Sequence, residues 1–211
     1  MPGQALFFAT GNEAKLAQLR WIARHLSSDV QVLSARARFG DAARYDEVGA
    51  TECAIARRGA LEVAARLGVA VLVEDTGLQV VALGGHPGIR AGRYLKAHGR
   101  AGLLRELEAC TVRRAEIVSA IAYATPGGVC SVYEHRVPGR ITRQERWTPG
   151  LPDWIAPAED NASGGGYNAV FVPVGETRTL AQIPPREALD WGYREPNFVA
   201  LLQDLRHVPS P

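Results

Sequence analysis

The stretch Val71-Leu72-Val73-Glu74-Asp75-Thr76-Gly77-Leu78 joins an apolar run directly to two adjacent carboxylates, followed shortly by a glycine. Such a run, bounded by glycine, predicts a buried strand whose acidic residues lie where it leaves the core. Neighbouring carboxylates repel each other, so they need solvent or a cation between them. Mg²⁺ held by one or two carboxylates and substrate phosphates is a common occupant of such a place. A surface turn that is merely acidic fits the stretch equally well.

Upstream of this stretch, the sequence predicts a strand, a tight turn and a helix. Residues 5–9 form an apolar run, and Thr10-Gly11-Asn12 follows with Asn12 as a natural N-cap. Apolar residues then recur at helical spacing, at Leu16, Leu19, Ala23 and Leu26. Lys15 falls in the first helical turn, where the helix dipole disfavours a cation unless an anion is bound. A solvated lysine that contributes little to folding is the alternative.

A second strand and a second helix lie between this turn and the acidic stretch. Residues 30–33 predict the strand, and the helix begins near Thr51 and stops at Gly68. Its expected apolar face is Ala54, Leu61 and Ala65, and Glu52 lies in its first turn. This alternation of strands and helices predicts an α/β fold with helices packed on a central sheet.

Downstream, residues 83–94 contain four glycines and a proline. Such a loop lets backbone N–H groups approach a ligand, and Arg90 and Arg93 would then face phosphates; a mobile surface loop is the alternative. The remaining pattern predicts a short helix at 103–107, a hairpin of 117–124 with 129–137, a strand at 169–172 and a last helix around 198–205. Residues 141–164 show no regular pattern.

Composition limits the class of protein. With 211 residues and 46% hydrophobic content, the chain suits one large domain or two closely packed lobes. A net charge of +2 argues against binding a nucleic-acid polymer. Three widely spaced cysteines argue for a reducing compartment and against a disulfide or zinc framework. We expect a cytoplasmic protein with no membrane segment.

These pieces together predict a phosphate and magnesium site assembled from separate segments. The chain has no GxxxxGK[ST] motif and no GxGxxG after its first strand, which excludes a P-loop and a dinucleotide-binding Rossmann site. The histidines show no metal-ligand spacing, and no Ser or Cys lies in a nucleophile elbow.

Five segments in order resemble the inosine triphosphate pyrophosphatase family, the non-canonical purine nucleoside triphosphatases. They are TGNEAK from Thr10, EDTGL from Glu74, ALGGHPGIRAGRY from Ala82, PGRIT from Pro138 and GGGYNAVFVP from Gly164. The resemblance implies an elongated two-lobed α/β fold, with a central mixed sheet flanked by helices and a cleft between lobes. It also implies a homodimer and Mg²⁺-dependent hydrolysis of a nucleoside triphosphate to the monophosphate and pyrophosphate.

The resemblance also implies residue roles. Asp75 matches the proton acceptor, with Glu74 and Lys15 as its catalytic partners, and Glu52, Glu74 and Asp75 match the metal-binding carboxylates. The substrate-binding positions are Thr10, Asn12, Lys15, Thr76, Arg93, Gly165, Gly166, Tyr167, Asn168, Tyr193 and Arg194.

The base side of this pattern departs from the family. Gly165-Gly166-Tyr167-Asn168 stands where Phe-Gly-Tyr-Asp is usual, and Gly192-Tyr193-Arg194 stands where Ser-His-Arg is usual. The missing phenylalanine is expected to leave a gap that Tyr193, Trp147 or Trp154 fills. Two function classes remain open at this point: an active pyrophosphohydrolase with altered base choice, and a nucleotide-binding relative that has lost turnover.

Overall fold

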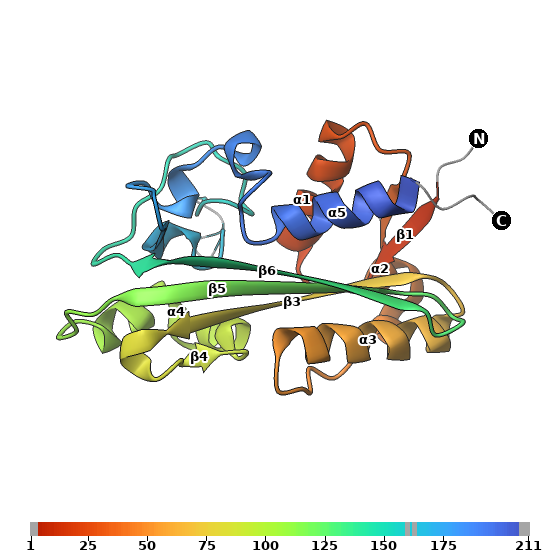
Figure 1. Cartoon of the computed structure of the whole chain (residues 1–211), viewed down its shortest axis with the longest axis horizontal. Helices are drawn as coiled ribbons and strands as arrows, with labels where there is room; N and C mark the ends of the chain where they lie inside the picture. The colour runs from red at the N-terminus through yellow and green to blue at the C-terminus, as the bar shows by residue number, and fades with distance from the viewer. Residues whose placement is uncertain (1–3, 159–160, 162–163, 207–211) are drawn as a thin grey trace. The chain divides into compact units, whose positions relative to one another are not determined.

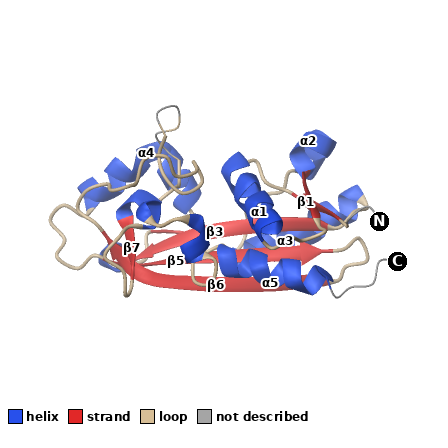
Figure 2. Ribbon diagram, turned by 90° about the horizontal axis from the view of Figure 1, so that it is seen from above, coloured by secondary structure: helices blue, strands red, loops and turns tan. Residues whose placement is uncertain are grey.

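The computed structural model describes residues 4–158, 161 and 164–206. A mixed seven-stranded sheet carries the helices, as Figures 1 and 2 show, and its strand order is β2-β1-β3-β5-β6-β7, with β4 paired to β3. The strands are β1 (Ala5–Phe8), β2 (Gln31–Ser34), β3 (Val71–Val80), β4 (Pro87–Gly88), β5 (Arg114–Ala124), β6 (Cys130–Ile141) and β7 (Phe171–Pro173). The helices are α1 (Glu13–His25), α2 (Ala35–Phe39), α3 (Glu52–Leu67), α4 (Ala91–Glu106) and α5 (Glu195–Arg206). The predicted α/β class with a mixed central sheet is confirmed.

The chain divides into two compact units. Unit 1 comprises the described parts of Met1–Asp75, Ser119–His135 and Arg194–Pro211, and unit 2 comprises those of Thr76–Val118 and Arg136–Tyr193. Strands β3, β5 and β6 each contribute residues to both units. The two lobes implied by the resemblance, the elongated outline and the cleft between the lobes stay predictions.

In unit 1, alternation along the strands sends successive side chains to opposite faces. β1 pairs in parallel with both β2 and β3. Helices α1 and α5 lie on one face of these strands and α3 lies on the other (Figures 1 and 2). Phe8 meets Phe198 of α5 edge-on at 6.0 Å between ring centroids. Val71 and Val73 instead pack in a buried cluster with small residues of α3.

Helix α1 begins as predicted, and α3 both begins and ends as predicted. Asn12 caps α1 by accepting hydrogen bonds from the backbone N–H groups of Ala14 and Lys15. Thr51 caps α3 in the same way, and α3 ends at Gly68 in the left-handed conformation. The predicted face of α3 is wrong, because Ala54 and Ala65 are exposed and the buried residues are instead Glu52, Ile55, Ala56, Gly59, Ala60, Val63 and Ala64. Alanine spacing alone does not define a face, since alanine is common on both.

Two predicted boundaries in the middle of the chain are wrong. β3 does not end at the acidic pair but continues to Val80, because Leu78 and Val80 extend its buried pattern. The glycine-rich segment is shorter than predicted, since α4 already begins at Ala91 and absorbs the short helix predicted at 103–107. Gly99, at φ +64°, breaks the helical geometry inside α4 and so hides its continuity in the sequence pattern.

Unit 2 has its own apolar core. Residues of β3, α4, β5 and the segment after β7 form one cluster, which includes Leu78, Leu103 and Phe171. A smaller cluster joins Ile155 and Ala156 to Ala169 and Ala181, with Trp154 packed against it. Ile155 and Ala156 therefore anchor the described part of the irregular segment within unit 2. Within the described residues, no helix is long and apolar enough to cross a membrane.

Candidate active site

Glu74 is the centre of an ion-pair group in unit 1. Its side chain has no exposed surface, and it pairs with Lys15, whose side chain is 16% exposed, and with Arg194, whose side chain is 12% exposed. The Arg194 Nε donates to Glu74 Oε1 at 3.0 Å, and the Lys15 Nζ contacts the Glu74 Oε2 and lies 3.4 Å from the Glu74 carbonyl oxygen. Two cations around one buried carboxylate leave a net positive charge at the N-terminal end of α1.

Polar side chains from α1, β5 and α5 hold this group in place. The Ser119 hydroxyl donates to Glu74 Oε1 at 3.1 Å, and the Asn197 amide donates to the Ser119 carbonyl at 3.0 Å. The side-chain amide of Gln18 on α1 donates a hydrogen bond to Glu195 Oε1 of α5 at 2.7 Å. Burial raises the pKa of Glu195. Because Ser119 and Asn197 are buried and bonded to each other, and the Glu74 side chain has no exposed surface, the orientation of Glu74 is fixed.

Sequence reasoning missed these supporting residues. Gln18 is one helical turn after Lys15 on α1, so the same face carries both side chains. Ser119 is a fully buried hydroxyl inside the apolar run of β5. Glu195 and Asn197 begin α5, where polar residues normally read as helix caps. These residues could have been identified in the sequence because each is a polar residue at a position where its helix or strand is expected to be buried.

Asp75 occupies the opposite face of β3 from Glu74, because adjacent strand residues alternate. It is 8% exposed, and its Oδ2 atom is buried without a hydrogen-bond partner among the described residues. Burial, chiefly, raises the pKa of Asp75 to about 7; Lys15 lowers it, while the carboxylates of Glu74, Glu47 and Glu52 raise it further. Asp75 therefore sits in an acidic, poorly solvated place that favours a proton or a cation.

Tyr45 and Glu47 belong to the same surroundings and were also missed. The phenol of Tyr45 has its pKa raised by burial and then by the charge of Asp75, with Glu47 and Glu74 adding to it. Both residues lie in the polar connection before α3, which the sequence left without a structure. No motif in that connection marked them.

The structure does not bring the three predicted metal ligands together as one group. Within the described residues, no set of three or more His, Cys, Asp and Glu side chains is placed to hold a metal ion. Glu74 is committed to Lys15 and Arg194 instead. Glu52, buried in the first turn of α3, acts electrostatically on Asp75. Because Mg²⁺ usually takes only one or two carboxylates and completes its shell with phosphate and water, Asp75 and Glu52 still fit such an ion, and the orphaned Oδ2 of Asp75 gives it a ligand.

The predicted phosphate-binding turn is in unit 1. The Thr10 hydroxyl oxygen accepts a hydrogen bond from the Asn12 backbone N–H at 3.0 Å, and Asn12 Oδ1 accepts from the Ala14 N–H at 3.0 Å. The turn is therefore ordered by its own side chains. Lys15 follows it in the first helical turn, as predicted, but as an ion-paired residue and not as a solvated lysine.

Most of the predicted base-side residues are in unit 2, where their side chains have structural partners. Tyr167 is 8% exposed and its hydroxyl donates to the Ala91 carbonyl at 2.9 Å. The Asn168 amide donates to the Ile155 carbonyl at 3.1 Å, while its Oδ1 is buried without a hydrogen-bond partner. Tyr193 is 6% exposed within the main core of unit 2. Arg194, predicted to contact the base, instead pairs with Glu74 in unit 1.

The gap expected at Gly165 is not there. A Cβ atom at this position would come within 2.2 Å of the Ile155 carbonyl oxygen, and Gly165 has φ +69°. Backbone of Ile155 and Ala156 therefore occupies the space, and none of the three expected aromatic residues, Tyr193, Trp147 or Trp154, contributes one of the nearest atoms. Gly166 has φ +58°.

The buried Arg100 of α4 holds the glycine segment 164–166 in place through hydrogen bonds to its backbone carbonyls. Its guanidinium pairs with Glu145 at 2.7 Å and donates to the carbonyls of Gly164 at 3.2 Å and Gly166 at 2.8 Å. Of the remaining predicted contacts, Thr76 is half-buried next to Asp75 in β3, and Arg93 is exposed in the first turn of α4.

Comparison with known proteins now assigns the family. The sequence profile of the Ham1 family matches residues 6–203. The chain belongs to the Ham1 family. This confirms the resemblance to inosine triphosphate pyrophosphatases that the five motifs predicted.

Ham1-family relatives match along nearly the whole chain. The dITP/XTP pyrophosphatase of Methanopyrus kandleri is 30% identical over 190 residues, covering 90% of this chain and 89% of the relative. That of Parasynechococcus marenigrum is 32% identical over 207 residues, covering 96% of each. Among solved structures, the nucleoside-triphosphatase / dITP/XTP pyrophosphatase of Mycobacterium abscessus is 32% identical with a TM-score of 0.64, covering 94% of this chain and 99% of that one. The Ham1 protein of Coxiella burnetii, at 23% identity and TM-score 0.76 over 97% and 100% of the chains, shares the fold.

Proposed function

We propose that this Ham1-family chain is a Mg²⁺-dependent enzyme that converts a nucleoside triphosphate to the monophosphate and pyrophosphate. As a family member it is a hydrolase of acid anhydrides, the class to which its relatives' names assign them. The observation that carries the proposal for this chain is the Lys15–Glu74–Arg194 group beside the buried carboxylate of Asp75.

The chemistry required is attack of water on the α-phosphorus. A new P–O bond forms to water, the bond between the α-phosphorus and the bridging oxygen breaks, and pyrophosphate leaves with the electron pair. Asp75 accepts the proton of the attacking water, because its buried carboxylate lies in surroundings that favour a proton. Lys15 and Arg194 stabilise the charge that develops on the departing pyrophosphate.

Asp75 and Glu52 are the residues that would hold Mg²⁺. When bound, the ion would neutralise phosphate charge and polarise the phosphoryl oxygens. In this assignment Glu74 has a different role from the one its sequence position suggested: it fixes the two cations in place.

We further propose that ITP and XTP are not the best substrates and that another nucleotide, such as a modified one, is preferred. The usual aromatic platform has no room at Gly165. The hydroxyl of Tyr167 and the amide of Asn168 are used within unit 2, so neither is free to read a base without rearranging. The Asn168 Oδ1 remains as a buried acceptor that a base donor would satisfy.

A panel of nucleoside triphosphates with Mg²⁺ tests both parts. Release of pyrophosphate from any of them supports the enzyme, and release from none leaves the nucleotide-binding relative without turnover. Values of kcat/KM across ITP, XTP, dITP and the common nucleotides then test the base choice. A kcat/KM that is higher for ITP or XTP by about 100-fold or more, which is a transition-state preference of nearly 3 kcal/mol, would contradict the altered specificity. The proposed reaction class would be unaffected.

A homodimer in the cytoplasm is the assembly and location we propose. The family resemblance supports both the homodimer and the cytoplasmic location. The free cysteines Cys53, Cys110 and Cys130 support the location alone, because they form no disulfide. Light scattering on the purified chain tests the assembly: a mass near 45 kDa, twice the 22.7 kDa of one chain, is expected, and 22.7 kDa would contradict it.

A further inference from the structure

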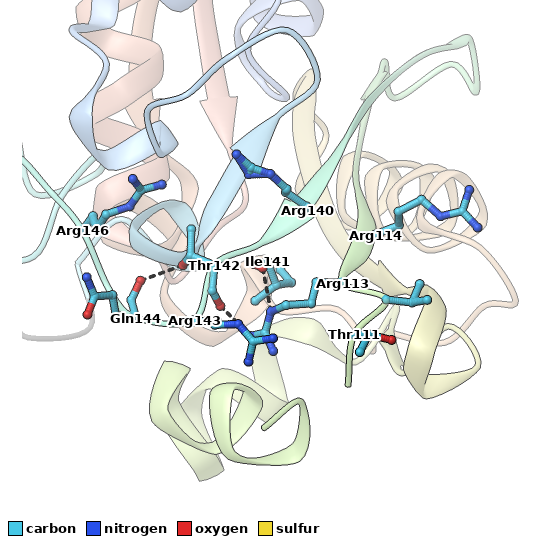
Figure 3. Close-up of a pocket in the computed structure, with 10 residues that line it drawn as sticks. Thr111, Arg113, Arg114, Arg140, Ile141, Thr142, Arg143, Gln144 and Arg146 are labelled. Atoms are coloured by element: carbon cyan, nitrogen blue, oxygen red, sulfur yellow. Dashed lines mark hydrogen bonds between the residues drawn. The ribbon is translucent and has the colours of Figure 1, made fainter. Parts of the chain in front are cut away.

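A pocket in unit 2 is lined by an unusual number of arginines. Figure 3 shows it at the start of β5 and the end of β6, with a volume of about 920 Å³. Five of its ten lining residues are arginine, at positions 113, 114, 140, 143 and 146, and none is acidic. None of these ten belongs to the candidate active site. The chain as a whole carries a net charge of only +2, so this concentration of one sign is local.

Arg113 is held rigidly in this pocket by neutral acceptors. Its Nε donates to the Ile141 carbonyl at 2.9 Å, and its terminal nitrogens donate to the carbonyls of Leu107 and Thr142. Carbonyl oxygens satisfy the hydrogen bonds of a guanidinium without cancelling its charge. The pKa of Arg113 is lowered by burial and then by the neighbouring charge of Arg143, so two like charges face one another here.

The more exposed arginines of the pocket also lack a counter-charge. Within the described part of the chain, Arg114, Arg140 and Arg143 have no carboxylate partner. Elsewhere in the same unit, Arg100 and Arg178 each pair with a glutamate. Some arginines of the unit are thus neutralised, while these three pocket arginines have no acidic partner among the described residues.

We infer that this pocket binds a compact ligand with several phosphate groups, such as a free polyphosphate or the phosphate chain of a second nucleotide. Arginine forks pair bidentately with phosphate oxygens, and several such forks around one concavity suit a multiply charged anion. A strand of nucleic acid is a poorer fit, because the lining contains no aromatic residue for base stacking and the overall charge is low. An occupant of this kind relieves the repulsion between Arg113 and Arg143.

Calorimetric titration of the full chain with inorganic tripolyphosphate, in EDTA and low salt, tests the inference. The pocket variant is Arg140→Glu with Arg143→Glu. Arg186→Glu, at an exposed site of the same unit, is the matched single-site charge control. Lys15→Ala, Glu74→Gln and Arg194→Ala together remove both cations of the active site and the buried carboxylate that would otherwise be left unpaired. We expect the pocket variant to bind about tenfold more weakly or worse, and both other variants to retain a binding event.

Each other outcome overturns the inference. No binding by the wild type, unchanged binding by the pocket variant, or loss of all binding in the Lys15→Ala, Glu74→Gln, Arg194→Ala variant would place no polyphosphate in this pocket. Binding of a single-stranded oligonucleotide that depends on Arg140 and Arg143, without binding of tripolyphosphate, would make the surface a nucleic-acid contact instead. Far-UV circular dichroism establishes that each variant is folded, and Arg140→Gln with Arg143→Gln replaces the charge reversal if it is not. ATP as a second probe separates a nucleotide from free polyphosphate.

Discussion

The Oδ2 atom of Asp75 is buried and has no hydrogen-bond partner in the part of the chain that the structure describes. We predict that Asp75→Asn lowers kcat on the order of 1000-fold or more, because it removes both the proton acceptor and a metal-binding charge. The fold should be retained, since an amide of the same shape is less costly to bury than a carboxylate. Pyrophosphate release and thermal unfolding measure the two effects. Asp190→Asn, at an exposed site, is the control, and near-full activity of Asp75→Asn would reject the assignment.

Lys15 has a structural role that its sequence position did not suggest. Removing it leaves the fully buried Glu74 with Arg194 as its remaining cation, so we predict that Lys15→Ala lowers stability by about 2 to 3 kcal/mol, or roughly 4 to 12 °C in Tm. Adding Glu74→Gln should recover part of that loss without restoring activity, because the buried charge is then gone. Thermal denaturation of the single and double variants is the measurement. An unchanged Tm for Lys15→Ala would contradict the pairing seen here.

At the scale of elements, the conformation of the glycine segment before β7 depends on the backbone atoms that surround it. Gly165 and Gly175 both have positive φ, at +69° and +86°, but only at Gly165 would a Cβ collide with backbone. We predict that Gly175→Ala costs about 1 to 2 kcal/mol, from backbone strain alone, and that Gly165→Ala costs clearly more. Chemical denaturation compares the two variants. Equal losses would mean that the segment yields easily and that Ile155 does not close the position.

Elements with a strong local signal were predictable, and those decided by distant contacts were not. The caps at Asn12 and Thr51, the hairpin of β5 and β6, and α5 all follow from patterns within one segment. The extent of β3 and α4 depends on packing from elsewhere. For the same reason the sequence identified Lys15 and Glu74 as site residues, but not that Arg194, 120 positions later, pairs with Glu74.

At the scale of the whole molecule, three strands belong to both units. We predict that the two units unfold in a single transition, because melting either one disrupts β3, β5 and β6. Trp21→Phe leaves Trp147, Trp154 and Trp191, all in unit 2, as the fluorescent reporters. In urea, their fluorescence should change at the same midpoint as far-UV circular dichroism. Two separated midpoints would show that the units are independent.

The interleaving of the two units along the chain has a genetic consequence. Unit 1 is encoded in three separate stretches of the gene, and unit 2 in the two stretches between them. A single crossover therefore cannot transfer either one intact to another protein, and neither can be cloned as an uninterrupted fragment. Residues that pair across those stretches, such as Lys15 and Arg194 around Glu74, must be inherited together. Sequence diversity in this fold is expected to arise by point substitution and by insertion within one stretch. Chimeras made by exchanging stretches between relatives should fail to fold, because residues that pair across the stretch boundaries no longer match.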